Sequence, residues 1–322
     1  MNMGIAIMTS GGDCAGMNPA IKKFVKLCFE HGEEPYLIYD GLEGLIDNNI
    51  KPADHEMVAG IVHLGGTIIR SSRSKRFFEH KYRQQAFDNL KALGIDKLVV
   101  LGGDGSFKAL DVFFKDFGVS FVGIPATIDN DIHGTEYCLG VDTALNIIRN
   151  AVDDIRDTAA SFKRGFVLEI MGRDCGYLTL VSALTNGAEV MIIPELPYNL
   201  DTIKARLKKE IDNGRRYAIA LVAEGVKVTD EVRRWMEEEV GMESRVTVLG
   251  HIQRGGNPTV FDRLMAFEFM TEAFKKLMSD PKSNYVVVYK DSRFDYVTID
   301  FINSARYEIK KDLIDLAKHL SV

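Results

Sequence analysis

The chain has 322 residues, and 46% of them are hydrophobic, so it is long enough for two domains that each bury a core. It carries 46 acidic and 40 basic residues, and this net charge of -6 disfavours a general nucleic-acid binder. No run reaches the roughly 18 uninterrupted apolar residues that cross a bilayer, and no export signal is visible, so we expect a cytoplasmic protein without membrane or nucleic-acid partners. The four cysteines lack paired spacing, which favours free structural thiols in a reducing compartment.

Short apolar runs alternate with segments of helical periodicity along the chain. The runs predicted to be buried strands are, in chain order, Gly4–Met8, Pro35–Tyr39, Lys97–Leu101, Ser120–Ile124, Gly165–Met171, Glu189–Ile193, Tyr217–Val222 and Arg245–Leu249. The segments predicted to be helices are Asn18–His31, Lys81–Leu93, Asp142–Ala159, Leu200–Asn213, Asp230–Val240 and Pro258–Met278. This alternation predicts an α/β fold with doubly wound, mostly parallel sheets.

Two similar glycine turns lie between a predicted strand and a helix. They are Gly11-Gly12-Asp13 and Gly102-Gly103-Asp104. At the carboxyl ends of parallel strands, glycine lets the backbone approach a ligand, and a helix N-terminus presents free N–H groups to phosphate. A Gly-Gly pair is also an ordinary tight turn, and neither turn contains a P-loop or dinucleotide fingerprint. A carboxylate beside a phosphate would repel it unless a hard cation lies between them, so Asp104 is predicted to face Mg²⁺.

An acidic loop, Thr127-Ile128-Asp129-Asn130-Asp131, follows the predicted strand Ser120–Ile124. One of its two carboxylates could act as a general base while the other holds the loop or the metal shell. The alternative is a surface turn of the Asx type, which is common for such sequences.

Arginines accompany glycines after two further predicted strands. One segment is Met171-Gly172-Arg173, and the other runs from Leu249 to Gly256 and reads LGHIQRGG. Arginines at strand ends are often only solvated. Several of them beside glycines, with Arg73, Arg164 and Arg245 also available, favour a site for more than one phosphate.

The ordered set of motifs resembles the 6-phosphofructokinases, in particular the bacterial ATP-dependent type. The matching segments are IMTSGGDCAGMN at Ile7–Asn18, GGDGS at Gly102–Ser106, TIDND at Thr127–Asp131, MGR at Met171–Arg173 and GHIQRGG at Gly250–Gly256. The resemblance covers nearly the whole chain. It implies transfer of the ATP γ-phosphoryl group to the 1-hydroxyl of fructose 6-phosphate in a homotetramer. It also implies two similar α/β domains with the active site in the cleft between them.

The domain boundaries implied by the resemblance are approximate. The nucleotide-binding domain would comprise residues 1–140 plus about 253–303, and the sugar-phosphate-binding domain residues 141–252 plus about 304–322.

Site residues follow from the resemblance position by position. The residues implied for ATP and Mg²⁺ are Gly12, Arg73, Ser74, Gly103, Asp104, Gly105 and Ser106, with Asp104 on the metal side. Asp129 is implied as the base, Thr127 lies beside it, and Arg173 faces the transferred phosphoryl group. The remaining residues implied for the sugar phosphate are Met171, Gly172, Glu224, His251 and Arg254, with Arg164 and Arg245 supplied by a neighbouring subunit.

A second, regulatory pocket for ADP or phosphoenolpyruvate is also implied by the resemblance. The matching positions are Lys22, Lys26, His55, Arg156, Glu189, Asn213 and Arg215. Lys22 and Lys26 stand where relatives carry arginine, and His55 and Asn213 depart further, so the pocket has fewer fixed charges for a diphosphate. We therefore expect shallow regulation.

Three alternatives are weighed against this interpretation. Pyrophosphate-dependent members of the family typically carry Asp after GGD and Lys before TIDND, whereas this chain has Gly105 and Ala126. NAD and lipid kinases share only the GGDG turn. A catalytically silent regulatory subunit would be marked by loss of the base, and Asp129 is present.

Overall fold

The computed structural model describes residues 4–280 and 282–321. The chain forms two compact units. Unit 1 contains the described residues up to Ile128 together with Ile132–Thr143 and Arg254–Arg306. Unit 2 contains Asp129–Asp131, Ala144–Gln253 and the described residues from Tyr307 onward.

Unit 1 is built on a seven-stranded sheet with the order β11-β10-β5-β4-β1-β2-β3. The strands are β1 (Gly4–Thr9), β2 (Pro35–Ile38), β3 (Ile50–Pro52), β4 (Ile95–Gly102), β5 (Ser120–Pro125), β10 (Asn284–Lys290) and β11 (Arg293–Thr298). All neighbouring pairs are parallel except β2–β3 and the hairpin β10–β11. Strands β1 and β5 are buried along their whole length, as expected for strands covered on both faces.

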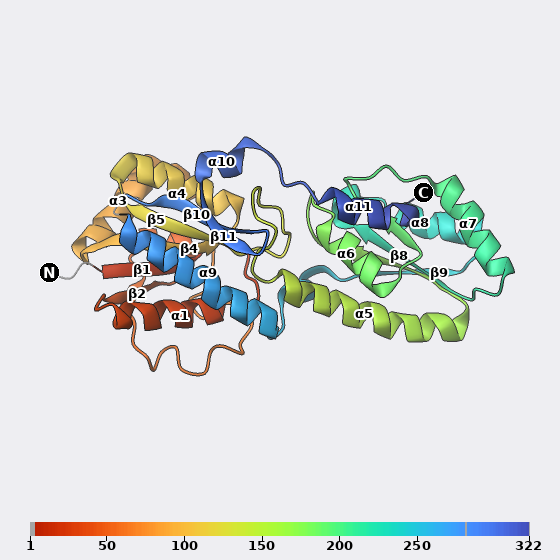
Figure 1. Ribbon diagram of the computed structural model, residues 1–322, viewed down its shortest axis with the longest axis horizontal. Coiled ribbons are helices and arrows are strands. Elements are labelled where there is room, and N and C mark those ends of the chain that lie inside the picture. Colours follow the sequence, from red (N-terminus) through yellow and green to blue (C-terminus); the bar gives the residue numbers. More distant parts are fainter. Residues whose placement is uncertain (1–3, 281, 322) are drawn as a thin grey trace. The chain divides into compact units, whose positions relative to one another are not determined.

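Helices cover both faces of this sheet. They are α1 (Met17–Glu30), α2 (Gly41–Ile46), α3 (His80–Ala92), α4 (Asp104–Phe117), α9 (Val260–Ser279) and α10 (Ile299–Ser304), with the 3₁₀ helix η1 (Arg76–Phe78). Figure 1 shows α3 and α4 on one side of the strands and α1 on the other. The long helix α5 (Val141–Phe162) has its first three residues in unit 1 and the rest in unit 2.

Unit 2 is built on four parallel strands in the order β7-β8-β6-β9. They are β6 (Gly165–Ile170), β7 (Val190–Ile192), β8 (Ala218–Ala223) and β9 (Ser244–Val248). The helices are α6 (Tyr177–Asn186), α7 (Leu200–Asp212), α8 (Thr229–Trp235), the π-helical η3 (Met236–Val240) and α11 (Lys311–Ala317), with the 3₁₀ helices η2 (Glu224–Val226), η4 (Gly250–Arg254) and η5 (Lys318–Leu320). Its core joins strand side chains such as Val167 and Val222 to Ile203 of α7 and Trp235 of α8.

The predicted α/β class with two mostly parallel, helix-covered sheets is confirmed. All four cysteines are buried, and within the described residues none of them forms a disulfide. Within residues 4–280 and 282–321, none of the helices is both long and apolar enough to cross a membrane.

Candidate active site

The two glycine turns of unit 1 lie side by side at one edge of its sheet. Strands β1 and β4 are parallel neighbours with Thr9 opposite Leu101, so their carboxyl ends coincide. The Ser10 N–H donates to the carbonyl of Leu101 at 2.9 Å, and the Ser106 hydroxyl donates to Ser10 Oγ at 2.9 Å. Gly11 has φ 92°, a left-handed conformation that glycine adopts without strain. The repeated sequence motif is therefore a spatial pair.

Helix α4 begins directly at the second turn. Gly103 is its extended N-cap, and Asp104 is its first residue. A Cβ added at Gly105 would have nothing within 4 Å, so the space above this turn is open. The free N–H groups and positive end of the helix dipole therefore face an accessible volume that suits a phosphate group.

The residues at this helix end fit a magnesium ion that arrives with a nucleotide. The Asp104 side chain is 41% exposed, and its carboxylate contacts Lys108 Nζ at 2.5 Å. In the described part of the chain, no group of three or more His, Cys, Asp or Glu could hold a metal by itself. Mg²⁺ is usually held by one or two carboxylates together with substrate phosphates, and Asp104 supplies one such carboxylate.

Cationic side chains flank the first turn. A Cβ at Gly12 would lie 2.1 Å from Arg254 Nη1, and that nitrogen donates to the Asp13 carbonyl at 3.2 Å. The Gly11 N–H donates to the Ser72 carbonyl at 3.3 Å, which places the exposed Arg73 next to the same turn. Arg254 therefore lies against the Gly11-Gly12-Asp13 turn of unit 1.

Two other predicted residues of unit 1 are also placed. Ser74 is buried and its hydroxyl accepts the Phe77 N–H at 3.1 Å, so it caps the turn that begins η1. The Ala126 N–H donates to the Gly102 carbonyl at 3.0 Å. Thr127 Cβ lies 4.0 Å from the position of a Cβ on Gly103, so Thr127 adjoins the N-cap of α4.

In unit 2, the acidic loop meets the arginine that follows β6. The Arg173 Nε lies 3.1 Å from Asp129 Oδ2. The Asp129 side chain is 1% exposed and the Arg173 side chain 55% exposed. A buried carboxylate is thus paired with a guanidinium that reaches solvent, which is suited to contact with an incoming anion.

The turn that carries Arg173 has an unusual backbone. Gly172 has φ 151° and Arg173 has φ 53°. Glu224, at the start of η2, accepts the N–H groups of Gly172 at 3.2 Å and Arg173 at 2.8 Å. A Cβ at Gly225 would lie 2.0 Å from the Arg173 carbonyl oxygen, so η2 packs directly on the turn.

The segment after β9 supports the same turn. The Met171 N–H donates to Gln253 Oε1 at 3.0 Å, and Gln253 is 1% exposed. His251 is exposed in η4. Because β6 pairs in parallel with both β8 and β9, the residues that follow these strands share one sheet edge. The residues gathered there are Met171, Gly172, Arg173, Glu224 and His251.

Arg164 and Arg245 lie at the opposite edge of this sheet. Arg164 precedes the first residue of β6, and Arg245 is near the start of β9. Glu243 contacts both, with Arg164 Nε 3.2 Å from its Oε2 and an ion pair to Arg245. At about 3.3 Å per strand residue, the six residues of β6 span roughly 20 Å between Arg164 and the turn that carries Arg173. Arg164 and Arg245 therefore lie at the far end of the β6 and β9 strands from Arg173.

The predicted effector residues fall into two sets. In unit 1, Lys22 and Lys26 lie on α1, Lys26 pairs with Glu30 at 3.6 Å, and the ring of the exposed His55 lies 4.5 Å from that of Phe29. The set in unit 2 is Arg156, Glu189, Asn213 and Arg215.

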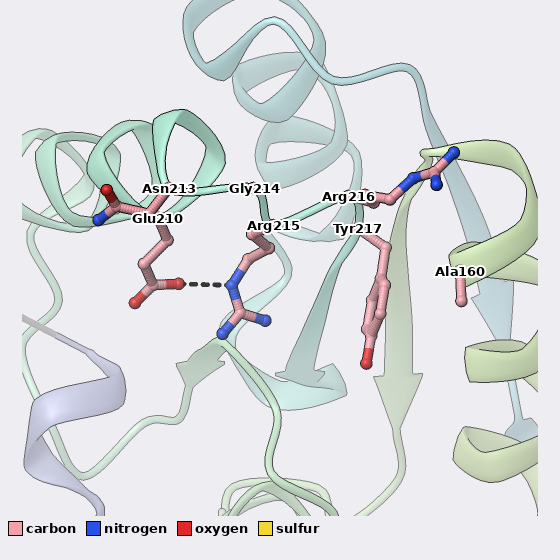
Figure 2. Close-up of a pocket in the computed structure, with 7 residues that line it drawn as sticks. All are labelled: Ala160, Glu210, Asn213, Gly214, Arg215, Arg216 and Tyr217. Carbon is pink, nitrogen blue, oxygen red and sulfur yellow. Dashed lines mark ion pairs between the residues drawn. The ribbon is translucent and has the colours of Figure 1, made fainter.

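Asn213 and Arg215 line an open pocket of about 510 Å³ at the end of α7, whereas Arg156 and Glu189 lie outside its lining, and Arg156 contacts the Asn186 carbonyl. Figure 2 shows Arg215 paired with Glu210, while Arg216 points away from it. Arg215 also pairs with Glu189, whose carboxylate accepts the Ile219 N–H at 2.7 Å. Burial raises the pKa of Glu189 above its usual value, against the lowering effects of the Ile219 N–H and Arg215. The carboxylates of Glu189 and Glu210 thus both form ion pairs with Arg215.

Several supporting residues were not singled out from the sequence. Glu195 holds the N–H of Gly176, and Asp262 accepts backbone N–H groups from Gly140 and Thr143 at 2.8 Å each. These contacts, like that of Gln253, join positions 19 to 122 residues apart. Only Gln253 had a signal, because it lies inside the GHIQRGG motif.

Comparisons with known proteins agree with this arrangement. The sequence pattern of the family described as Phosphofructokinase matches residues 4–277. Proteins named ATP-dependent 6-phosphofructokinase are 56% identical over 315 residues in Sulfurimonas denitrificans and 54% identical over 319 residues in Wolinella succinogenes. These alignments cover 98% of both chains in the first comparison and 99% of both in the second.

A solved structure agrees as well. The phosphofructokinase of Saccharomyces cerevisiae is similar with a TM-score of 0.89 and 33% identity, over 94% of this chain and 45% of the yeast chain. Because the family pattern and the bacterial relatives span nearly all of the sequence, the chain belongs to the phosphofructokinase family.

Proposed function

We propose that this protein transfers the γ-phosphoryl group of ATP to the 1-hydroxyl of fructose 6-phosphate, giving fructose 1,6-bisphosphate and ADP. The observation that carries the proposal is the contact of 3.1 Å between Arg173 Nε and the buried carboxylate of Asp129. A base next to a partly exposed cation is what attack by a hydroxyl on a phosphoryl group requires.

Unit 1 takes the role of nucleotide-binding domain in this proposal. The N–H groups at the start of α4 and the turn at Gly12 would hold the phosphates, with Arg73 across them. Asp104 would hold Mg²⁺, which supplies charge neutralisation on the nucleotide phosphates when bound. Ser106 fixes the two turns to each other through Ser10.

Unit 2 takes the role of sugar-phosphate-binding domain. Asp129 accepts the proton of the 1-hydroxyl as that oxygen attacks, and Thr127 orients the same loop. Arg173 stabilises the negative charge that spreads over the transferred group. Glu224 holds the Arg173 backbone through two N–H groups, and its carboxylate and His251 contribute polar groups for sugar hydroxyls.

The choice of ATP over pyrophosphate rests on Gly105. The open space above this residue admits the α-phosphate and the nucleoside, whereas a carboxylate at the same position would repel them. A coupled assay with fructose 6-phosphate, Mg²⁺ and either ATP or pyrophosphate tests the proposal. Turnover with ATP at least 100-fold above that with pyrophosphate is expected. Turnover with neither donor would refute the function, and preference for pyrophosphate would refute the donor.

Arg164 and Arg245 act, in this proposal, on the 6-phosphate bound by a neighbouring subunit of a homotetramer. Their position beyond the opposite end of β6, a strand about 20 Å long, from Arg173 supports action on another copy. Mixing an Arg245→Ala protein with an Asp129→Ser protein should restore activity, because a hybrid interface holds one intact site. Absence of recovery after verified subunit exchange would place these arginines outside the substrate site.

Regulation by ADP or phosphoenolpyruvate is proposed to be shallow. The proposal rests on Arg215, whose charge is already balanced by Glu189 and Glu210, and on the lysines at positions 22 and 26. Each effector should change the rate at subsaturating fructose 6-phosphate by less than about fivefold. Steep, sigmoidal control at micromolar effector would contradict it.

A further inference from the structure

Glu195 lies behind the turn that carries Arg173. It follows β7 and reaches the start of α6, where its Oε1 accepts the N–H of Gly176 at 2.8 Å. Gly176 is the N-cap of α6 and stands three residues after Arg173. The carboxyl is mostly buried, which raises its pKa above the usual value against the lowering effects of the Gly176 N–H and the Cys175 thiol.

The contact is sterically close. A Cβ on Gly176 would lie 2.5 Å from Glu195 Oε2 and 2.5 Å from Ile193 Cβ. Gly176 has φ -86°, which any residue adopts, so glycine is needed here for space and not for conformation. The carboxyl of Glu195 thus rests against the backbone of the turn, and a side chain at Gly176 would displace it.

The turn between Met171 and Gly176 is held at both ends. At its start, Glu224 accepts the N–H groups of Gly172 and Arg173. Across the middle, the Cys175 N–H donates to the Gly172 carbonyl at 2.9 Å. At its end, Glu195 holds Gly176. Arg173 has a left-handed backbone, which a residue other than glycine keeps only where its surroundings fix it.

We propose that Glu195 is a positioning residue for the reaction, because it anchors the end of this turn and thereby keeps the Arg173 guanidinium against Asp129. The inference rests on the proposed function, in which both of those residues take part. Without the Glu195 anchor, Gly176 is free to move, and the turn relaxes from the left-handed conformation at Arg173. The guanidinium then leaves its place beside Asp129 for part of the time, so the loss falls on the chemical step.

The first test compares three single variants in the full-length protein. Glu195→Ala should lower kcat by about 10- to 100-fold with the KM for fructose 6-phosphate within about threefold. Glu195→Gln keeps an oxygen acceptor for the Gly176 N–H and should recover most of kcat. Asn199→Ala is the matched control, because the Asn199 side chain caps α7 of the same unit by accepting the Thr202 N–H at 3.0 Å. It should lower the melting temperature without reducing kcat.

The second test asks whether Glu195 acts through Arg173. In an Arg173→Ala background, adding Glu195→Ala should lower kcat by less than about threefold, because the guanidinium it positions is already absent. If kcat of the double variant fell by the product of the two single-variant losses, the proposal would be overturned. An unchanged kcat in Glu195→Ala alone would also overturn it. Should that variant fail to fold, Glu195→Asp keeps the charge but cannot reach Gly176, and the same expectations apply to it.

The two proposals fail in different ways. If Arg173→Ala and Asp129→Ser retain full activity, the proposed function of the site is wrong. If both lose activity while Glu195→Ala does not, only the positioning role of Glu195 is wrong.

Discussion

Replacement of Asp129 by serine is the sharpest perturbation of the proposed site. The change removes a carboxylate that is fully buried and whose Oδ2 lies 3.1 Å from Arg173 Nε. Two effects on the rate follow. The attacking hydroxyl loses its general base, and Arg173 loses the charge that holds its guanidinium in place.

The magnitude follows from these two effects. Loss of a positioned general base lowers kcat by about 10²- to 10⁴-fold. A bare Coulomb estimate for the pair, at an effective dielectric constant of about 20, is about 5 kcal/mol. Because the Arg173 side chain is 55% exposed, water screens most of this, and about 1 kcal/mol remains. We therefore expect kcat to fall by about 10³-fold or more, a rise in the barrier of about 4 kcal/mol.

The assay measures kcat and the KM for fructose 6-phosphate at saturating ATP. The KM should stay within about threefold, because the proton leaves the hydroxyl only in the transition state. Asp131→Ser is the matched control in the same loop, and its kcat should fall by less than about tenfold. Asp129→Asn, which keeps the shape of the side chain, should behave as Asp129→Ser does. An Asp129→Ser enzyme within threefold of the parent would refute the assignment of the base.

Further changes test other parts of the molecule. Arg173→Ala should lower kcat by about 10²-fold, and a change confined to KM would instead give it a binding role. Gly105→Asp should raise the KM for ATP at least about tenfold at an unchanged melting temperature, since the space there is open; an unchanged KM would contradict the assigned nucleotide position. Asp262→Ala leaves four buried donors without their acceptor and should lower the free energy of unfolding, measured in urea, by about 3 to 5 kcal/mol; a loss below about 1 kcal/mol would contradict this. Burial raises the pKa of Glu195 in the folded protein. The stability that the protonated carboxyl contributes is therefore lost as pH rises through the folded pKa. The melting temperature of Glu195→Gln relative to the parent should therefore increase from about pH 5 to pH 8, and a decrease would reverse the sign of the argument.

The predicted strands were located well because each is a short apolar run buried in a sheet. Strand β5, for example, was expected at Ser120–Ile124 and spans Ser120–Pro125. The hairpin β10–β11 was not predicted, although the valines of β10 are visible in the sequence. In the structure its two turn residues, Asp291 and Ser292, both have positive φ. An edge hairpin lacks the alternation of strand and helix on which the expectation was based.

The position of the two glycine turns could be predicted for a topological reason. Parallel strands bring their carboxyl ends to one edge, so motifs that follow such strands must meet there, however far apart they are in sequence. This explains why Gly11 and Gly102 could be expected to be neighbours. The anchors behind the site could not be predicted, because contacts such as Glu195 with Gly176 depend on how loops pack after the strands are in place.

The arrangement of charge in unit 2 supports the proposal that neighbouring subunits share an active site. The sheet has a cation, Arg173, at its carboxyl edge and two more, Arg164 and Arg245, at its amino edge. Glu243 holds the latter pair together, so that two guanidinium groups face one region although they come from different strands. A sugar bisphosphate is far shorter than the roughly 20 Å between the two edges. We therefore propose that one copy offers Arg173 to one substrate while its Arg164 and Arg245 serve a substrate bound by another copy.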